Sequence, residues 1–321
     1  MSIVPASRTD TLELLAVSAI WGASFLCITI ALVDLAPLEI AAWRLGGAAL
    51  VLLVFVRWRR LPLPLDRRSL LLFLLIGAFN GAIPFTLISW GQQSVTSSTT
   101  AILIATSPFA TLALSHVLSD DEPFGWDRLA GMSLGFVGIL VLFIGAGSEA
   151  GVGAGAGAGG GADSGGGGVG ASALPGMAAI VAAACCYALS GILIRRLTGV
   201  PGLSVAAGTL CAGALLLLPF LLVVHPPWRV SAGAQASAAL AFLILGPTAL
   251  AYVMRARIVQ RNGAVFMSGV GYLIPLFAVL WGWLFLDERP SSRVFIALSL
   301  VLAGIAVGQW RSYTGRLPRK R

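Results

Sequence analysis

Charged residues are scarce in this chain of 321 amino acids, and their scarcity excludes an ordinary soluble domain. Asp, Glu, Lys and Arg make up 11% of the sequence and hydrophobic residues 58%, with a mean hydropathy of +0.92. Soluble domains carry about 25% charged residues, because their surfaces face water. Several apolar runs approach the length of about 20 residues that a helix needs to cross a bilayer. Because these runs do not alternate between polar and apolar residues, they predict membrane-spanning helices rather than barrel strands.

Motifs for metal, cofactor or covalent chemistry are also missing from the sequence. The four cysteines lie inside apolar segments without the C-x-x-C spacing of a metal or redox site, which predicts buried, inert thiols. They are Cys27, Cys185, Cys186 and Cys211. The glycine-rich stretch at 151–170 contains no lysine and follows no predicted strand, so it is not a phosphate-binding loop. We therefore expect no metal site, no cofactor, no catalytic residues and no enzymatic activity.

Carboxylates are absent from the middle of every apolar run. All 13 acidic residues lie at the ends of the runs, in loops or in the glycine-rich stretch. A proton relay through a membrane protein ordinarily uses an acidic residue inside a helix. The sequence therefore leaves the coupling ion and the energy source open.

Hydropathy in windows of about 19 residues predicts ten spans in two groups of five. They cover residues 12–32, 36–57, 69–90, 96–118, 127–146, 174–194, 202–224, 236–257, 263–286 and 292–310. The segment between the groups is almost entirely glycine and alanine, which is typical of a flexible linker. The predicted organisation is a five-helix repeat at 1–146, a linker at 147–173, a second five-helix repeat at 174–310 and a basic cytoplasmic tail at 311–321.

The basic residues predict how the chain is oriented in the membrane. If the N-terminus is cytoplasmic, all but four of the 21 basic residues lie at the cytoplasmic side, the exceptions being Arg44, Arg229, Arg289 and Arg293. The positive-inside rule then favours two cytoplasmic termini. Topology thus accounts for the formal net charge of +8, and we expect no nucleic-acid partner. The predicted location is a bacterial inner membrane.

An ordered series of residues occurs twice along the chain. Pro108-Phe109-Ala110 and Pro275-Leu276-Phe277 are each followed by an acidic cluster and a second proline, Pro123 or Pro290, at a constant offset of 167. The clusters are Asp120-Asp121-Glu122 and Asp287-Glu288. Because five is odd, the second group of spans enters the membrane from the opposite side. This predicts an inverted repeat, which lets a site near the midplane open alternately to each face.

The last span of each group carries a G-x-x-x-G motif, formed by Gly131 with Gly135 and by Gly304 with Gly308. Small residues at this spacing let two helices approach closely. The motifs predict packing between helices of the chain, and a contact within a homodimer stays open as the alternative.

Segments of the chain from Leu14 to Trp310 resemble the EamA family of the drug/metabolite transporter superfamily. The run Trp21-Gly22-Ala23-Ser24-Phe25 is similar to the W-G-x-x-F run of the family's first helix, and Trp43-Arg44-Leu45 to the arginine segment of its second. The stretch from Pro275 to Asp287-Glu288 resembles its P-x(12)-E-like element. The resemblance implies ten helices, cytoplasmic termini and transport of metabolites such as amino acids.

The chain departs from the family pattern at three places. In the first half Ser119-Asp120-Asp121-Glu122 stands where a glycine and a single glutamate are usual. In the sixth span Tyr187-Ala188-Leu189-Ser190 replaces the tryptophan-glycine pair, and no arginine of the seventh span matches Arg44.

Arg44 is the most deeply embedded charge of the sequence, roughly two turns into the second predicted span. A guanidinium at this depth can bind an anionic substrate group such as a carboxylate through two parallel hydrogen bonds. The alternative is a structural role, in which the side chain snorkels to the surface or pairs with Glu39.

Other polar and aromatic side chains of the spans could line a cavity together with Arg44. Serine, threonine and asparagine could equally bond one helix to another, and some aromatic residues could form an interfacial belt. The third span is the most suggestive, because Pro84 interrupts it close to Asn80. The full set of candidate substrate-binding residues is Trp21, Arg44, Asn80, Trp90, Gln93, Ser107, Tyr187, Tyr252, Ser268 and Tyr272.

These observations favour a secondary transporter that moves a small organic metabolite by alternating access, with export as the favoured direction. Its expected partners are the small-molecule substrate and the lipid bilayer. Two alternatives stay open, namely a membrane-embedded enzyme acting on lipid-linked intermediates and a structural or regulatory membrane subunit.

Overall fold

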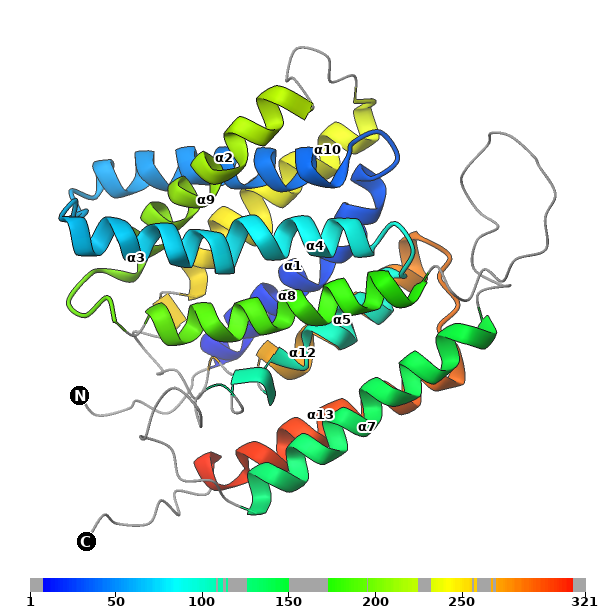
Figure 1. Cartoon of the computed structure of the whole chain (residues 1–321). Coiled ribbons are helices and arrows are strands. Elements are labelled where there is room, and N and C mark those ends of the chain that lie inside the picture. Colours follow the sequence, from blue (N-terminus) through cyan, green and yellow to red (C-terminus); the bar gives the residue numbers. More distant parts are fainter. Residues whose placement is uncertain are drawn as a thin grey trace, which may run out of the picture.

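Helices are the only regular elements of the part of the chain that the structure, a computed structural model, describes (Figure 1). Those residues are 8–107, 109–111, 114, 126–149, 173–194, 196–224, 232–255, 257–258, 267 and 270–313. We refer to residues 8–149 as the N-terminal half and to residues 173–313 as the C-terminal half.

In the described residues, both halves consist of helices. The N-terminal half contains α1 (Arg8–Ala31), α2 (Pro37–Trp58), α3 (Arg67–Gly77), η1 (Ala78–Ala82), α4 (Ile83–Gly91), α5 (Ser97–Ile104) and α7 (Trp126–Glu149). The C-terminal half contains α8 (Ala173–Ile194), α9 (Gly202–Val224), α10 (Ala234–Leu243), η4 (Ile244–Leu250), α12 (Val270–Phe285) and α13 (Ser292–Tyr313). The elements η1 and η4 are π-helical and continue directly into the α-helical segments beside them.

Six of the described helical segments are long and apolar enough to cross a bilayer. They are Arg8–Ala31, Pro37–Trp58, Arg67–Gly91, Ala173–Ile194, Gly202–Val224 and Ala234–Arg255. These segments coincide with the first, second, third, sixth, seventh and eighth spans expected from the sequence. Shorter apolar helices lie at Leu129–Leu142, Leu273–Phe285 and Ser292–Gly304, within the fifth, ninth and tenth expected spans. The chain is therefore a multi-pass helical membrane protein.

The fourth expected span, 96–118, is not one continuous helix. Helix α5 ends at Ile104, and Ala105 and Thr106 form a turn. The sequence explains the interruption, because Pro108 has no N–H to donate to the Ile104 carbonyl one turn earlier. Most of the remaining residues of this expected span lie outside the described residues.

Proline also explains the two π-helical elements. Pro84 follows η1 closely, and Pro247 lies inside η4. A proline inside a helix leaves the carbonyl four residues earlier without its usual donor. Behind Pro247 that carbonyl belongs to Leu243, and the Thr248 hydroxyl donates to it at 2.8 Å. A side chain of the same helix thus adds a hydrogen bond to a carbonyl that has lost its α-helical donor, in a place where lipid offers none.

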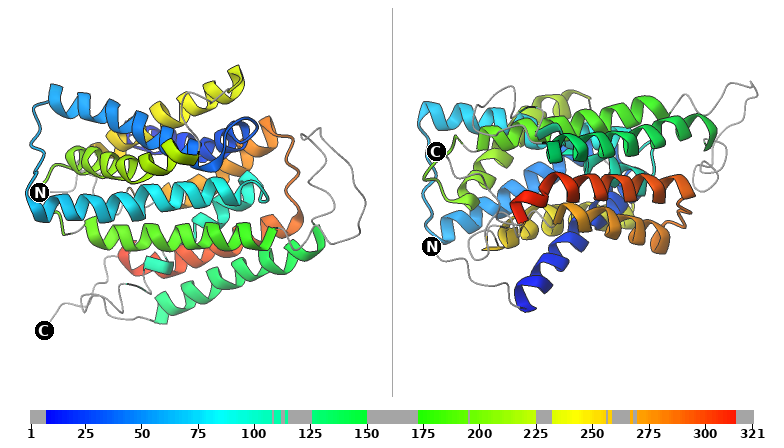
Figure 2. Two further views of the ribbon diagram at one scale, coloured as in Figure 1. Left: turned by 45° about the horizontal axis from the view of Figure 1, so that its top comes forward. Right: turned by 90° about the horizontal axis from the view of Figure 1, so that it is seen from below.

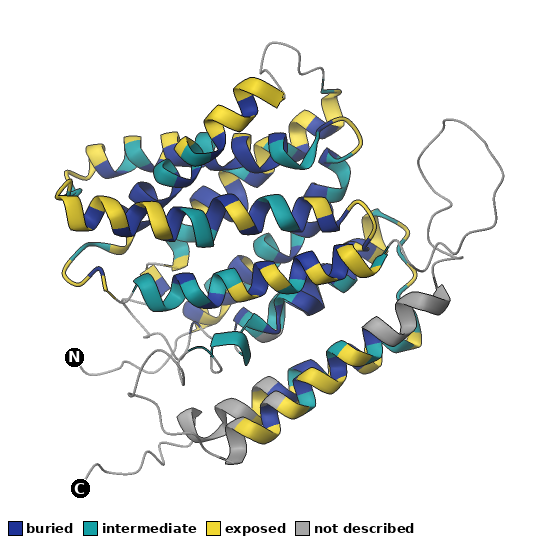
Figure 3. Cartoon of the chain, viewed as in Figure 1, coloured by how far each residue is buried: buried dark blue, intermediate teal, exposed yellow. Residues whose placement is uncertain are grey.

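Each half packs its helices against the other half rather than mainly against itself. Helix α1 lies against α12, α2 against α9, α4 against α8, and α7 against α13. The last pair is set at one side of the bundle (Figures 1 and 2). Residues on the outer surfaces of the peripheral helices are mostly exposed (Figure 3), and they include large apolar side chains such as Val54, Leu215 and Phe220. Apolar side chains on these surfaces suit contact with lipid tails.

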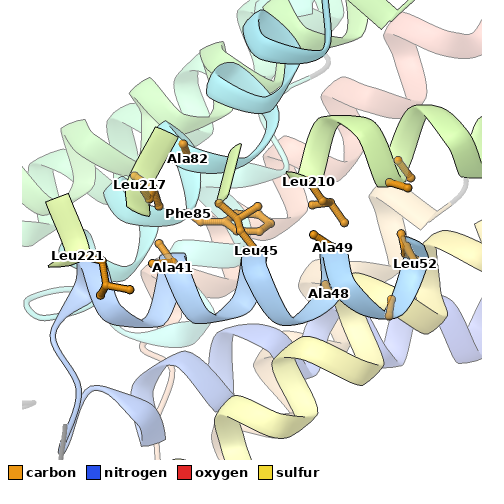
Figure 4. Packing of buried hydrophobic residues seen from close by; sticks show 14 of the residues in the cluster. Ala41, Leu45, Ala48, Ala49, Leu52, Ala82, Phe85, Leu210, Leu217 and Leu221 are labelled. Atoms are coloured by element: carbon orange, nitrogen blue, oxygen red, sulfur yellow. The ribbon is translucent and has the colours of Figure 1, made fainter. Parts of the chain in front are cut away.

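The largest buried cluster joins α2, α4 and α9 (Figure 4). Alanines and leucines repeat along one face of α2 and meet Phe85 of α4 and leucines of α9. The buried α2 members are Ala41, Ala42, Leu45, Ala48, Ala49, Leu52 and Val56. Small side chains on α2 let α9 approach closely, so this helix pair fixes the two halves beside Arg44.

Cys27 is buried, whereas Cys185 is exposed on α8 and the thiols Cys186 and Cys211 are half-buried. The expectation of four buried thiols is therefore wrong for Cys185. Hydropathy could not reveal this, because lipid-facing and core-facing positions of a membrane helix are equally apolar.

The G-x-x-x-G glycines bring α7 and α13 into backbone contact. A Cβ atom on Gly304 would lie 2.6 Å from the Gly131 carbonyl oxygen and 2.8 Å from the Gly135 nitrogen. The predicted packing between helices within the chain is thus confirmed. The homodimer stays a prediction.

We expect Gly304→Ala to lower the thermal unfolding temperature of the protein in detergent. The added methyl group has to push the Gly131 backbone away, and overpacking of this kind costs about 1–3 kcal/mol. Gly191→Ala is the matched control, because a Cβ atom there meets nothing within 4 Å. Equal unfolding temperatures for the two variants would contradict the close α7–α13 contact.

Candidate functional site

Arg44 lies inside the bundle and contacts both halves. Its side chain is 7% exposed. The Nε atom donates to the Thr248 hydroxyl of η4 at 2.8 Å. The guanidinium carbon lies 4.1 Å from the centre of the Phe85 ring of α4, a cation–π contact. The guanidinium therefore points toward the contact between α2, α4 and η4.

No carboxylate pairs with Arg44 among the residues that the structure describes. Its electrostatic neighbours there are the side chains of Tyr187, Tyr252 and Cys27. Glu39, the acidic residue nearest in sequence, accepts the Ala36 N–H at 2.7 Å and so caps the start of α2. Burial of a charge without a counter-charge costs several kcal/mol, which is typical of a residue retained for function.

Asn80 is the second polar centre of the bundle. Its Nδ2 atom donates to the Tyr252 hydroxyl at 3.1 Å, and its Oδ1 atom accepts from the Ser190 hydroxyl at 3.1 Å. The Ser190 hydroxyl also lies 2.8 Å from the Tyr187 carbonyl oxygen. These contacts join η1 of the N-terminal half to two helices of the C-terminal half.

Trp21 of the N-terminal half contacts the π-helical element of the C-terminal half. Its Nε1 atom donates to the Pro247 carbonyl at 2.8 Å, so α1 is bonded to η4. A Cβ atom on the adjacent Gly22 would lie only 2.7 Å from Phe277 Cβ and 3.0 Å from the Ala278 nitrogen. The Trp-Gly pair thus combines a hydrogen bond to one helix with backbone contact to another.

Five of the candidate residues lie together at the centre of the bundle, and we call them the central group. They are Trp21, Arg44, Asn80, Tyr187 and Tyr252. Trp90 is 46% exposed near the end of α4, and Gln93 is exposed in the turn that follows. Ser107 is half-buried beyond the end of α5, where its carbonyl accepts from the Thr111 hydroxyl at 2.9 Å. Ser268 lies outside the described residues, as does the side chain of Tyr272.

Four residues of the central region were not among the candidates. Thr248, Phe85 and Ser190 contact Arg44 or Asn80 directly. Gln92, not Gln93, is the buried glutamine, and it donates to the Phe25 carbonyl at 2.9 Å and the Thr29 hydroxyl at 3.1 Å. A signal for Thr248 was present in the sequence, because a hydroxyl next to a mid-span proline can satisfy the carbonyl that the proline frees.

Two cavities of the described structure lie away from the central group. One, of about 520 Å³, lies between α12 and α13 beside Leu276, Leu280, Trp283 and Arg289. The other, of about 200 Å³, lies between the start of α3 and the turn after α8, beside Asp66, Arg68, Arg196 and Val200. Outside the membrane spans, hydrogen bonds from Ser69 hold the pKa of Asp66 below its ordinary value.

Long apolar helices surround a buried arginine and a hydrogen-bonded polar group, an arrangement that suits a membrane protein with a polar site between its helices. The chain belongs to the EamA-like transporter family, which matches residues 11–144 and, separately, residues 174–307.

The sequence similarity to known relatives covers nearly the whole chain. An S-adenosylmethionine/S-adenosylhomocysteine transporter of Chlamydia trachomatis is 26% identical over 292 residues, covering 89% of this chain and 84% of its own. A "Probable terminal-alkyne amino-acid exporter" of Streptantibioticus cattleyicolor is 26% identical over 289 residues, covering 89% and 88%. A protein crystal structure with 20% sequence identity matches 97% of this chain and 100% of its own with a TM-score of 0.65. That structural match supports the fold.

The hydrogen bond between Asn80 and Tyr252 should couple the two halves energetically. We expect Asn80→Ala and Tyr252→Phe to destabilise the protein less than additively when combined. The interaction energy from a double-mutant cycle should be about 0.6 kcal/mol, the average for hydrogen bonds inside membrane proteins. The measurement is unfolding in mixed detergent micelles. Strictly additive effects would contradict the contact, and Tyr252→Phe combined with the distant Arg57→Ala is the control pair.

Proposed function

We propose that the protein is a secondary transporter that carries a small organic metabolite across a bacterial inner membrane by alternating access. Its membership of a transporter family and the transporters among its relatives support this class of function. We further propose ten spanning helices, both termini in the cytoplasm and export as the direction. The excess of basic residues at the side of the termini supports the orientation.

The two halves are proposed to be inverted repeats that exchange conformations during transport. The family matches each half separately, and the contacts between the halves are reciprocal. Trp21 of α1, the first helix of the N-terminal half, bonds to the π-helical element η4 of the other half. Ser190 of α8, the first helix of the C-terminal half, bonds to Asn80 of the π-helical element η1. Such symmetry supports two equivalent arrangements of one bundle.

The substrate is proposed to bear a carboxylate that binds Arg44. The observation that supports this proposal most directly is the buried guanidinium of Arg44. Among the described residues Thr248 is its only hydrogen-bond partner, and no carboxylate pairs with it. Arginine has five N–H donors in a planar fork, so a carboxylate can bind side-on to those that Thr248 does not use. The added negative charge would offset the cost of burying the cation.

The side chains around Arg44 offer a hydrogen-bond donor and an aromatic face to the parts of such a substrate other than its carboxylate. The Tyr252 hydroxyl accepts from Asn80, and its own hydrogen remains to donate. Tyr187 lies close by and adds an aromatic face. The relatives fit the same chemistry, because the amino acids and S-adenosyl amino acids in their names carry a carboxylate. We therefore propose amino acids or related compounds as the substrate class.

Proteoliposomes containing the purified protein should accumulate carboxylate-bearing members of a panel of amino acids and related metabolites, and not their amides or esters. Arg44→Ala and Arg44→Lys should each lower transport by about 30-fold or more, because the loss of a buried charge partner costs about 2 kcal/mol or more. The lysine of Arg44→Lys should not restore transport, because its ammonium group lacks the planar fork of N–H donors.

Arg57→Ala is the matched control for these variants, because Arg57 lies exposed near the end of the same helix. All three variants have to insert and elute as the parent does in size-exclusion chromatography. Parental transport by both Arg44 variants would contradict the assignment of the carboxylate site. Absence of flux for the whole panel would contradict the transport function itself.

A further inference from the structure

Two carboxylates on one face of the bundle bind backbone N–H groups of the opposite half. Glu288, between α12 and α13, accepts the Ser97 N–H at 2.8 Å and the Ser98 N–H at 3.2 Å, and it also accepts the Ser98 hydroxyl. Asp34, between α1 and α2, accepts the Gly233 N–H at 2.7 Å. Each acid therefore caps a helix of the other half, α5 in one case and α10 in the other. We call the face that carries these turns, on the right of Figure 1, the gate face.

The backbone conformation around Glu288 places its carboxylate at the start of α5. Asp287 adopts a left-handed conformation with φ of 51°, and the Glu288 N–H returns to the Gly282 carbonyl at 3.1 Å. A Cβ atom on Gly282 would lie 2.5 Å from Glu288 Oε2 and 2.9 Å from the Ser97 hydroxyl oxygen. Only a glycine leaves room for the carboxylate between α12 and α5.

The opposite face differs at the matching positions. Asp66 precedes Gly233 by 167 positions, the offset of the repeated prolines, and the position that matches Asp34 is Pro201. Between the start of α3 at Asp66 and the turn at Val200 the structure has the cavity of about 200 Å³ described above, with Arg68 and Arg196 at its wall. At these matching positions the gate face has a hydrogen bond between the halves and the other face has a space. The larger cavity, beside Arg289, lies between two helices of the same half and does not separate the halves.

We propose that Glu288 and Asp34 are the gate residues of the transporter, which hold the gate face closed in the present conformation. This inference rests on the proposed alternating access. To open the gate face, the halves have to separate at α5 and α10, and each separation breaks the capping bonds of a carboxylate and frees helix N–H groups that water then solvates. The capping bonds made by Glu288 and Asp34 thus set the balance between the closed and the open gate.

A native thiol can report on the gate. Cys27 of α1 is buried in the hydrophobic cluster against which Tyr187 packs, so it lies beside the central group. With Cys185, Cys186 and Cys211 replaced by serine, Cys27 is the only thiol of the chain. A membrane-impermeant methanethiosulfonate reagent, applied separately to each side of proteoliposomes without substrate, measures how often water reaches it.

We expect Glu288→Gln to raise the labelling rate of Cys27 from the gate-face side by about tenfold, because a charged hydrogen-bond partner is lost. Asp34→Asn should act in the same direction. Ser98→Ala removes one hydroxyl donor and leaves both N–H groups, so it should give a smaller increase with little risk to folding.

Asp287→Asn is the matched control, because it removes a charge from the same loop while asparagine tolerates the left-handed conformation. Parental labelling in Glu288→Gln, Asp34→Asn and Ser98→Ala, or an equal increase in Asp287→Asn, would overturn the proposal. The assay uses no substrate, so it reads the gate even if every solute of the transport panel fails.

Discussion

The Thr248 hydroxyl is the group on which the centre of this molecule depends. It donates to the Leu243 carbonyl, which Pro247 deprives of its α-helical donor, and it accepts from Arg44 Nε, both at 2.8 Å. A free carbonyl and an unsupported guanidinium are each costly inside a bilayer. One side chain therefore repairs the break in its own helix and orients the buried charge of the other half. The proline and the arginine are tolerated together because of this shared partner.

Close backbone approach holds the halves around that centre. Helices in lipid gain little from apolar burial against one another, so they depend on tight packing and on hydrogen bonds. Gly22 lets α1 contact α12, and Trp281 of α12 donates to the Ala19 carbonyl of α1 at 3.1 Å. Gly77 does the same for α3 and α9, since a Cβ atom there would lie 2.6 Å from the Thr209 carbonyl oxygen. Contacts of this kind keep the two halves in register without large side chains that interlock.

The sequence predicted the helical membrane fold well, because uninterrupted hydropathy locates a span whatever its neighbours are. It also predicted the inward role of the glycines at Gly131 and Gly304, since their spacing has one main use. It could not predict which side of a helix faces inward. Gln92 and Gln93 are neighbours in the turn that ends α4, yet only Gln92 is buried. Trp90 lies away from the central group, and the sequence could not reveal this, because aromatic residues are also common on the outer surface of membrane proteins.

The proposed gate and the central group are connected through α12 and α1. Glu288 follows α12 directly, and α12 is fixed to α1 by Trp281 and by backbone contact at Gly22. Helix α1 in turn carries Trp21, which is bonded to the Pro247 carbonyl next to Thr248 and Arg44. A shift of α12 that draws Glu288 away from α5 therefore has to move α1 with it or break these contacts. Since Trp21 and Thr248 meet on η4, a π-helical segment that its proline already leaves with fewer backbone bonds, this segment is where the movement is most easily absorbed. The irregular helix and the buried arginine thus occupy the same place, so the proposed substrate site adjoins the part of the fold that is most easily rearranged.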